Sequence, residues 1–130
     1  MFSIEQIHQA FSKVKSGADF PQLVQDLKNL GVSHYDNFVS NGLINYYGSG
    51  DFQVKSAPKY AALEINNTGS AERLKQALSI HQQGQTDYLT FCRQAADAGV
   101  EKWTTDMLKM TVTYFDKQGR ILLTEPIPQP

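Results

Sequence analysis

One helix-forming segment occurs twice in this chain of 130 residues, and it constrains the fold more than any other feature. Asp87–Val100 begins with an aspartate and ends with a glycine, and Asp19–Val32 repeats that pattern 68 positions earlier. An aspartate at a helix start accepts hydrogen bonds from free backbone amides, and a glycine at a helix end adopts a left-handed conformation at little cost. The chain is therefore expected to contain one helical unit in two copies.

Strand-like segments follow both copies at the same offset of 68 residues. The similar pairs include Tyr35/Trp103, Tyr46/Tyr114, Tyr47/Phe115 and Pro58/Pro126. This order predicts two tandem ααβββ repeats, about 3–58 and about 70–126, with an extra strand at about 60–65. Helices that precede runs of strands favour an α+β fold. We expect a single domain over residues 1–130, a two-layer sandwich whose antiparallel sheet is covered by helices on one face.

Local signals set the expected bounds of the elements. Ser3 and Gln6 have the spacing of a capping box for a helix over 3–15. Further helices are expected over 20–30, from Ser70 to Gly84, and over 87–98, with strands at 33–40, 43–47, 52–56, 60–65, 101–108, 110–115 and 120–124. Asn41-Gly42 predicts a hairpin turn. The equivalent positions of the second half hold Lys109-Met110, so the second hairpin turn should differ in type. Alternating prolines, Pro126, Pro128 and Pro130, predict an extended tail.

Composition excludes several classes of protein. Hydrophobic residues make up 41% of the chain and the net charge is −1, without runs of like charge, so we expect no nucleic-acid partner. No apolar run is long enough to cross a membrane, and the first residues lack the pattern of a secretory signal. Cys92 is the only cysteine, which suits a reducing compartment. We expect a cytoplasmic protein without a metal or other cofactor.

Three stretches of the chain resemble a known bacterial family: Lys15–Phe20, Leu43–Gly48 and, most specifically, His81–Cys92. They are similar to the uncharacterised YdfO-like proteins, some of them borne on prophages and some labelled "phage envelope protein". The resemblance covers nearly the whole chain and implies a two-layer α+β fold. It implies no activity, cofactor or catalytic residue.

His81 is the strongest candidate for chemistry outside the strands. It follows Leu78 on the apolar stripe of its helix, near the helix end, and precedes the amide-rich stretch that begins with Gln82. A partly buried histidine can act as a general base, whereas the simpler interpretation is a histidine bonded to free helix carbonyls. Asp87 could pair with His81 or cap the next helix, and capping is favoured. Cys92, on the core face of its helix, is expected to be an inert buried thiol.

The strand aromatics form a second group of candidates. Alternation sends Tyr46 and Tyr47 to opposite faces of the sheet, and likewise Tyr114 and Phe115. One member of each pair should join the core and the other should lie on the uncovered face, where aromatics would mark a dimer surface or a ligand groove. The alternative is cross-strand packing that only stabilises the sheet. The candidate ligand-binding residues are His81, Gln82, Trp103, Tyr46, Tyr114 and His34, with Asp36 beside the last.

Two functions are therefore open at this point. The first is a non-enzymatic binding or protein-interaction module of a soluble bacterial or prophage-derived protein, acting as a homodimer through the uncovered sheet face. The second is a small-molecule-binding protein or enzyme with a site near His81 and the strand aromatics. Histidine and cysteine spacing predicts no metal site.

Overall fold

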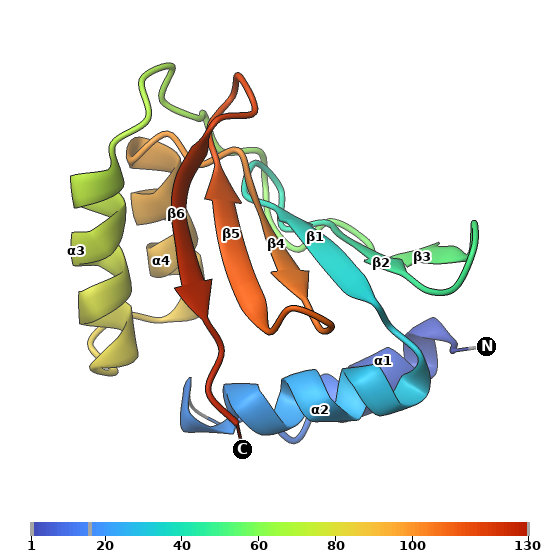
Figure 1. Ribbon diagram of the computed structural model, residues 1–130. Helices are drawn as coiled ribbons and strands as arrows, with labels where there is room; N and C mark the ends of the chain where they lie inside the picture. The colour runs from blue at the N-terminus through green and yellow to red at the C-terminus, as the bar shows by residue number, and fades with distance from the viewer. Residues whose placement is uncertain (1, 16, 130) are drawn as a thin grey trace.

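A computed structural model describes residues 2–15 and 17–129, so that Met1, Ser16 and Pro130 lie outside the described residues. In chain order the elements are α1 (Ile4–Phe11), a 3-10 turn (Gly17–Asp19), α2 (Phe20–Leu30), β1 (His34–Phe38), β2 (Ile44–Tyr47), β3 (Gln53–Lys55), α3 (Ala71–Gln82), α4 (Tyr88–Asp97), β4 (Lys102–Asp106), β5 (Thr111–Phe115) and β6 (Ile121–Pro126). Figure 1 shows α1 and α2 beside the ends of the strands and α3 and α4 as a second pair beside β6.

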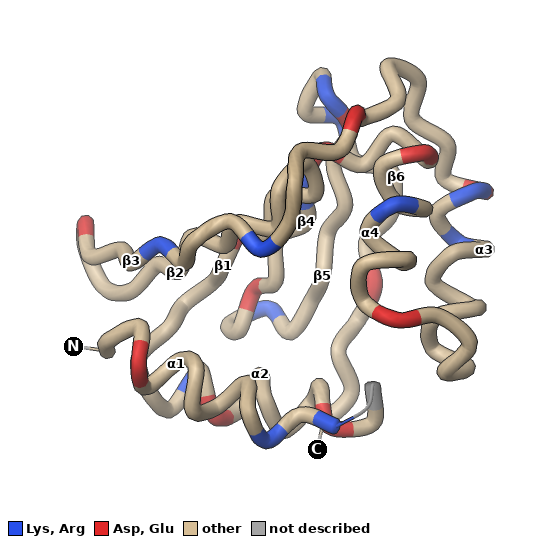
Figure 2. Tube along the Cα trace, turned by 180° about the vertical axis from the view of Figure 1, so that it is seen from behind, with Lys and Arg blue, Asp and Glu red and all other residues tan. Residues whose placement is uncertain are grey.

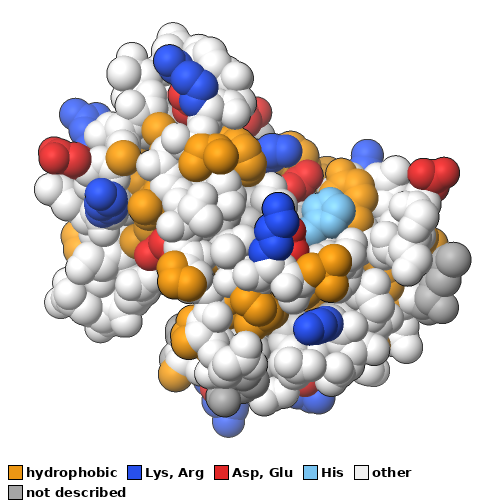
Figure 3. Space-filling view, in the orientation of Figure 1, with side chains coloured by type: hydrophobic (Ala, Val, Ile, Leu, Met, Phe, Trp, Pro, Cys, Tyr) orange, Lys and Arg blue, Asp and Glu red, His pale blue; other side chains and the backbone are white. Residues whose placement is uncertain are grey.

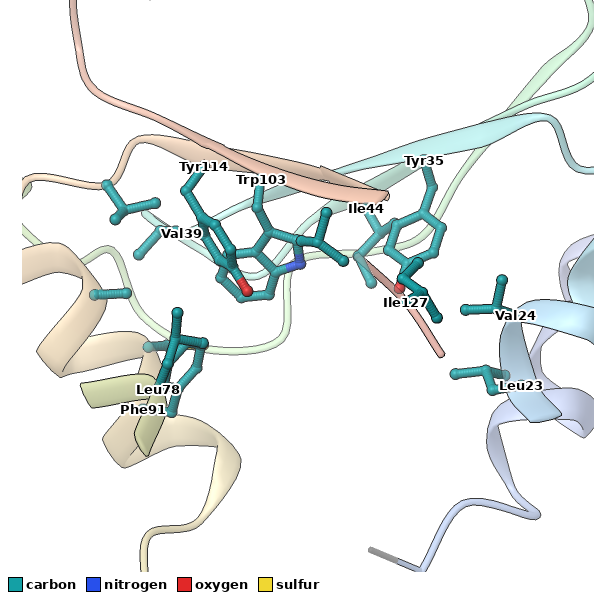
Figure 4. Packing of buried hydrophobic residues seen from close by; sticks show 14 of the residues in the cluster. Leu23, Val24, Tyr35, Val39, Ile44, Leu78, Phe91, Trp103, Tyr114 and Ile127 are labelled. Atoms are coloured by element: carbon teal, nitrogen blue, oxygen red, sulfur yellow. The ribbon is translucent and has the colours of Figure 1, made fainter. Parts of the chain in front are cut away.

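The six strands form one antiparallel sheet in the order β3-β2-β1-β4-β5-β6. Each half of the chain contributes three consecutive strands, and β1 and β4 join the halves at the centre. Both helix pairs lie on the same side of this sheet, toward which the core side chains point (Figure 4). The α+β class and the antiparallel sheet expected from the sequence are thereby confirmed.

The helix caps mostly follow local chemistry. Ser3 and Gln6 form the expected capping box, and Ser70 and Asp87 accept hydrogen bonds from Arg73 N and Thr90 N. The expectation that Asp19 caps α2 is wrong. Its carboxylate turns back and accepts a hydrogen bond from Lys15 N, 2.8 Å away, because the 3-10 turn puts Asp19 itself in a helical conformation.

Two predicted bounds also fail. The first helix ends at Phe11 and not at residue 15. The next residue, Ser12, donates from Oγ to the carbonyl of Gln9, and the chain leaves the helix there. Residues 60–65 form no strand, because their backbone amides bond to a turn and not to a strand: Leu63 N donates to Ser40 O. We call residues 56–70 the connecting segment.

The two hairpin turns can be compared at equivalent positions. Both have the same four-residue length, between Phe38 and Leu43 and between Asp106 and Thr111. Met110 adopts a positive φ of 54°, as Gly42 does at 75° in the first hairpin, although this conformation suits glycine better. The hydrogen bonds of the two turns differ as expected: Gly42 N donates to Phe38 O in the first, and Leu108 N and Lys109 N donate to Asp106 Oδ1 in the second.

Strand pairing in the two halves follows one register at the offset of 68. His34 pairs with Tyr47 in β1–β2, and Lys102 pairs with Phe115 in β4–β5. At the centre of the sheet Asp36 pairs with Thr104, the residue 68 positions later. Whether the halves descend from a duplication stays a prediction. The shared register means that equivalent positions of the two halves can be compared directly.

The core fills the space between the sheet and the two helix pairs. Figure 4 shows Trp103, Tyr114 and Val39 facing Leu78 and Phe91 of the helix pair α3–α4. On the other side Tyr35 and Ile44 face Leu23 and Val24 of α2, with Ile127 between sheet and helix. Ile127 follows Pro126, the last residue of edge strand β6, so the expected extended tail packs its first apolar side chain into the core.

Candidate functional site

The six candidate ligand-binding residues do not meet in one place. Tyr46, Trp103 and Tyr114 belong to the core, with exposed fractions of 2%, 8% and 6%. His81 and the exposed Gln82 lie at the end of α3, whereas His34 begins β1. The three core residues cannot contact a ligand without a rearrangement of the core.

His81 stands at the outer end of a series of stacked rings. The ring centroids of His81 and Phe91 are 4.8 Å apart. Phe91 packs on Trp103 with centroids 5.7 Å apart, and Trp103 packs on Tyr114 with centroids 5.9 Å apart. His81 Nδ1 lies 3.0 Å from Thr86 O and 3.1 Å from Thr86 Oγ1. A neutral imidazole that donates from Nδ1 to the carbonyl keeps Nε2 as an acceptor. Nε2 has no hydrogen-bond partner in residues 2–15 and 17–129, so His81 combines a fixed ring with one free nitrogen.

The neighbours of His81 have structural roles. Asp87 Oδ1 accepts the amide of Thr90 at 2.8 Å, which confirms capping. The hydrogen bonds from Thr90 hold the pKa of this carboxyl below its usual range. Cys92 is fully buried, and burial raises the pKa of its thiol. It is therefore a protonated core thiol, as the sequence predicts, and a poor nucleophile.

The side of the sheet away from the helices forms a surface that we call the open face. Paired residues on adjacent antiparallel strands point to the same side. One row across all six strands of the open face consists of Lys55, Asn45, Asp36, Thr104, Thr113 and Thr124. Figure 3 shows hydrophobic side chains in small groups between polar ones over the visible surface.

Asp36 organises the centre of the open face. Its carboxylate accepts a hydrogen bond from Thr104 Oγ1 at 2.6 Å, and Lys102 Nζ lies 3.6 Å from the other oxygen. The Lys102 ammonium also lies 5.3 Å from the Phe115 ring centroid, at cation–π distance. The Asp36 side chain is 12% exposed, so its charge is balanced by neighbours on its own sheet.

A second cluster lies one row away from Asp36. The His34 ring stacks on Tyr47 with ring centroids 4.4 Å apart and an angle of 8° between the planes. Tyr47 OH accepts a hydrogen bond from Asn45 Nδ2 at 2.9 Å. Asn45 is buried at 6% exposure, and its Oδ1 has no partner within the described residues. The open face therefore has one unpaired acceptor buried beneath its surface.

Sequence reasoning missed several residues of these clusters. The alternation of Lys102–Asp106 predicts that Lys102, Thr104 and Asp106 share a face, and this signal could have placed them beside Asp36. Lys59 had no such signal. Its ammonium lies between the rings of Phe11 and Tyr88, which are distant in sequence.

The rest of the described surface has two hollows and no metal cluster. Two surface hollows are lined by Glu64–Asn67 with Asp97 and by side chains of α1 and α2, away from His81 and the open face. Within residues 2–15 and 17–129, no three His, Cys, Asp or Glu side chains come together as metal ligands would. Acidic and basic side chains are interspersed over the chain (Figure 2). No helix in the described ranges has the length and apolar character needed to span a bilayer.

Comparison with known proteins gives two findings. A family model described as protein of unknown function (DUF1398) matches residues 8–126. The uncharacterized protein YcgX of Escherichia coli (strain K12) is 21% identical over 127 residues, covering 98% of this chain and 95% of YcgX. These matches confirm the expected membership of an uncharacterised family, and neither description indicates an activity.

Proposed function

Since the chain belongs to the DUF1398 family of proteins of unknown function, we propose a function from geometry alone: a non-enzymatic interaction module that pairs with a second copy of itself through the open face. The observation that carries this proposal is the chemistry at the two ends of the paired strands, which we call the margins of the open face. Lys102 lies beside Phe115 on one margin. Asp106 lies in the row of His34 and Tyr47 on the other margin.

Two-fold symmetry makes these margins complementary. An axis along the Asp36–Thr104 row would place the margin of Lys102 against the Asp106 margin of the other copy. Each copy then contributes the same patch, as in the isologous interfaces of most dimers. The paired margins bring opposite charges together twice, and each also brings aromatic area to the interface.

The size of the open face sets the expected strength. Strands about 4.8 Å apart, each of about five residues with a rise of about 3.3 Å, give six strands a flat footprint of roughly 400 Å². Each partner of a stable complex buries about 800 Å². We therefore expect a reversible dimer with a dissociation constant on the order of 10–100 µM.

Sedimentation velocity over a concentration series tests this function. Thr113→Arg places a long charged side chain at the centre of β5 on the open face, and Gln76→Arg makes the same change on the exposed surface of α3. The wild type and Gln76→Arg should show the same concentration-dependent mass, while Thr113→Arg stays monomeric. A wild type that remains monomeric at about 500 µM, well above the expected dissociation constant, would remove the proposal.

We also propose that the protein is YdfO-like, prophage-related and cytoplasmic. The stretches Lys15–Phe20, Leu43–Gly48 and His81–Cys92 support the first two features, and the unpaired Cys92 supports a reducing compartment. Fractionation of cells that express the chain should place it with soluble cytoplasmic markers. Recovery with the cell envelope would contradict this location.

His81 supports a second candidate function, the binding of a small molecule at the end of α3. The free Nε2 on an imidazole fixed by Thr86 is the observation that favours it. Native mass spectrometry of the protein purified from cells should show a retained ligand on the wild type that His81→Gln loses. Identical masses for the two proteins, after correction for the substitution, would count against this candidate.

A further inference from the structure

Lys59 lies at a seam between the two helix pairs, away from the open face. Its Nζ is 5.8 Å from the ring centroid of Phe11, at the end of α1, and 5.4 Å from that of Tyr88, at the start of α4. The backbone of the connecting segment is fixed here, because Lys59 N donates to Asn41 O at 2.8 Å. The lysine side chain is therefore directed into the seam from a rigid point.

The charge of Lys59 is not paired with a carboxylate, and the acidic group that acts on it is the thiol of the buried Cys92. Lys59 makes no ion pair with any carboxylate among residues 2–15 and 17–129. Burial lowers the pKa of its ammonium, since charge in a partly dry setting is disfavoured. The aromatic rings offset part of that cost through cation–π attraction. A bound anion would offset more of it, because an opposite charge nearby favours the charged form.

A polar floor lies beneath this lysine. Asn37, buried at 4% exposure, donates from Nδ2 to Tyr88 OH at 3.0 Å. The Tyr88 hydroxyl donates to Asn37 Oδ1 at 3.4 Å, a long hydrogen bond, and burial raises the pKa of this hydroxyl, so it remains a protonated donor. Tyr88 is 38% exposed and Lys59 is exposed as a whole residue, so part of each side chain faces solvent.

The equivalent seam on the other side of the molecule is apolar. The positions 68 residues away from Lys59, Tyr88 and Cys92 are occupied by Ile127, Phe20 and Val24. Ile127 is 6% exposed and lies between the sheet and α2 (Figure 4). One seam is thus closed by a packed isoleucine, and the other presents a cation beside a tyrosine hydroxyl.

We propose that Lys59 and Tyr88, supported by Asn37, form a binding site for a small aromatic carboxylate. Lys59 Nζ pairs with the carboxylate, and the Tyr88 hydroxyl donates a hydrogen bond to a carboxylate oxygen. The aromatic body of the ligand packs on the exposed part of the Tyr88 ring. This site is independent of the proposed dimer, because Lys59 lies on the helix side of the sheet.

Benzoate is the probe that tests this site, with the neutral benzamide and the non-aromatic acetate as comparisons. Titration of the ¹⁵N-labelled protein should give saturable amide shifts at Lys59 and Tyr88 with benzoate, in the millimolar range. Loss of the charge should weaken binding at least about tenfold, as expected for a hydrogen bond to a charged group. Benzamide and acetate should both bind more weakly than benzoate.

Matched variants identify the residues responsible. Lys59→Met should lose the saturable shifts, whereas Lys75→Met, which removes an exposed lysine of α3, should keep them. If Lys59→Met fails to fold, Tyr88→Phe removes one hydroxyl and should weaken benzoate by several-fold. Absence of saturation with the wild type, equal binding of benzamide, or unchanged binding by Lys59→Met or Tyr88→Phe would overturn the proposal.

Discussion

Replacement of Gly99 by alanine should be among the most destabilising single-methyl changes in this protein. Gly99 ends α4 with a φ of +84°, a conformation that costs an alanine roughly 1–2 kcal/mol. A Cβ at this position would also lie 2.6 Å from Gly69 Cα and 2.7 Å from Thr68 O. These are backbone atoms of the connecting segment, which cannot move aside as a flexible side chain can.

The expected size of the effect combines both terms. Overpacking of a tight site typically costs about 1–3 kcal/mol, so Gly99→Ala should lower the free energy of unfolding by roughly 2–5 kcal/mol. Gly84→Ala is the matched control. Gly84 has a similar φ of +76°, but an added Cβ meets nothing within 4 Å, so the change should cost only about 1–2 kcal/mol.

Urea denaturation followed by fluorescence measures both variants, because Trp103 is the only tryptophan and lies in the core. Gly99→Ala should shift the midpoint clearly further than Gly84→Ala, with an unchanged slope. Equal shifts would show that the connecting segment is not held against the end of α4. The reasoning about its close packing would then be refuted.

Three further predictions concern buried groups and strained turns. Burial raises the pKa of Tyr35 to about 12, above its value in the unfolded chain. The stability that this group contributes is therefore lost as pH rises from about 10 to about 12. Tyrosinate absorbance should rise together with unfolding and not gradually near pH 10. Gly42→Ala should lower the free energy of unfolding, because its φ is +75° and its Cβ would lie 2.7 Å from the Tyr60 ring; thermal unfolding measures the change. A thiol reagent should modify Cys92 only at the rate of transient unfolding, and rapid labelling of the native protein would contradict its burial.

Helix ends were predictable where their chemistry is local. Ser3 with Gln6, Ser70 and Asp87 all cap the helices that follow them, since each cap needs only an amide two or three residues away. Asp19 has the same residue type and position relative to its helix, but it is the last residue of a 3-10 turn, and its carboxylate accepts a hydrogen bond from Lys15 N instead. The conformation of that turn depends on tertiary packing, which a helix pattern does not contain.

Strand content was predictable, whereas pairing partners were not. Residues 60–65 look like a strand, but the amides of Tyr60 and Leu63 bond to the first hairpin turn. In the same way, alternation predicts that Tyr46 and Tyr47 part to opposite faces, without saying which of them faces the helices. Tyr46 takes the core position, so the residues available on the open face are Tyr47 and its partner His34.

The candidate sites depend on contacts between distant segments. His81 was identifiable from its place on the apolar stripe near the end of its helix, whereas its contact with Thr86 was not predicted. The Asp36–Thr104 hydrogen bond joins residues 68 positions apart, and Lys59 meets Phe11 and Tyr88 only after the helix pairs assemble. Alternation places residues such as Lys102 and Thr104 on one face of the sheet, but it does not report which distant segments meet, which is why the contacts of Asp36 and Lys59 required the folded structure.

The most direct test of self-association maps amide chemical shifts of the ¹⁵N-labelled protein against its own concentration. Dilution should move the signals of open-face residues such as Asp36, Thr104 and Thr113, because the proposed dimer covers them, while signals of α1–α4 stay fixed. Shifts confined to the helices, or spectra that do not change with concentration, would contradict pairing through the open face.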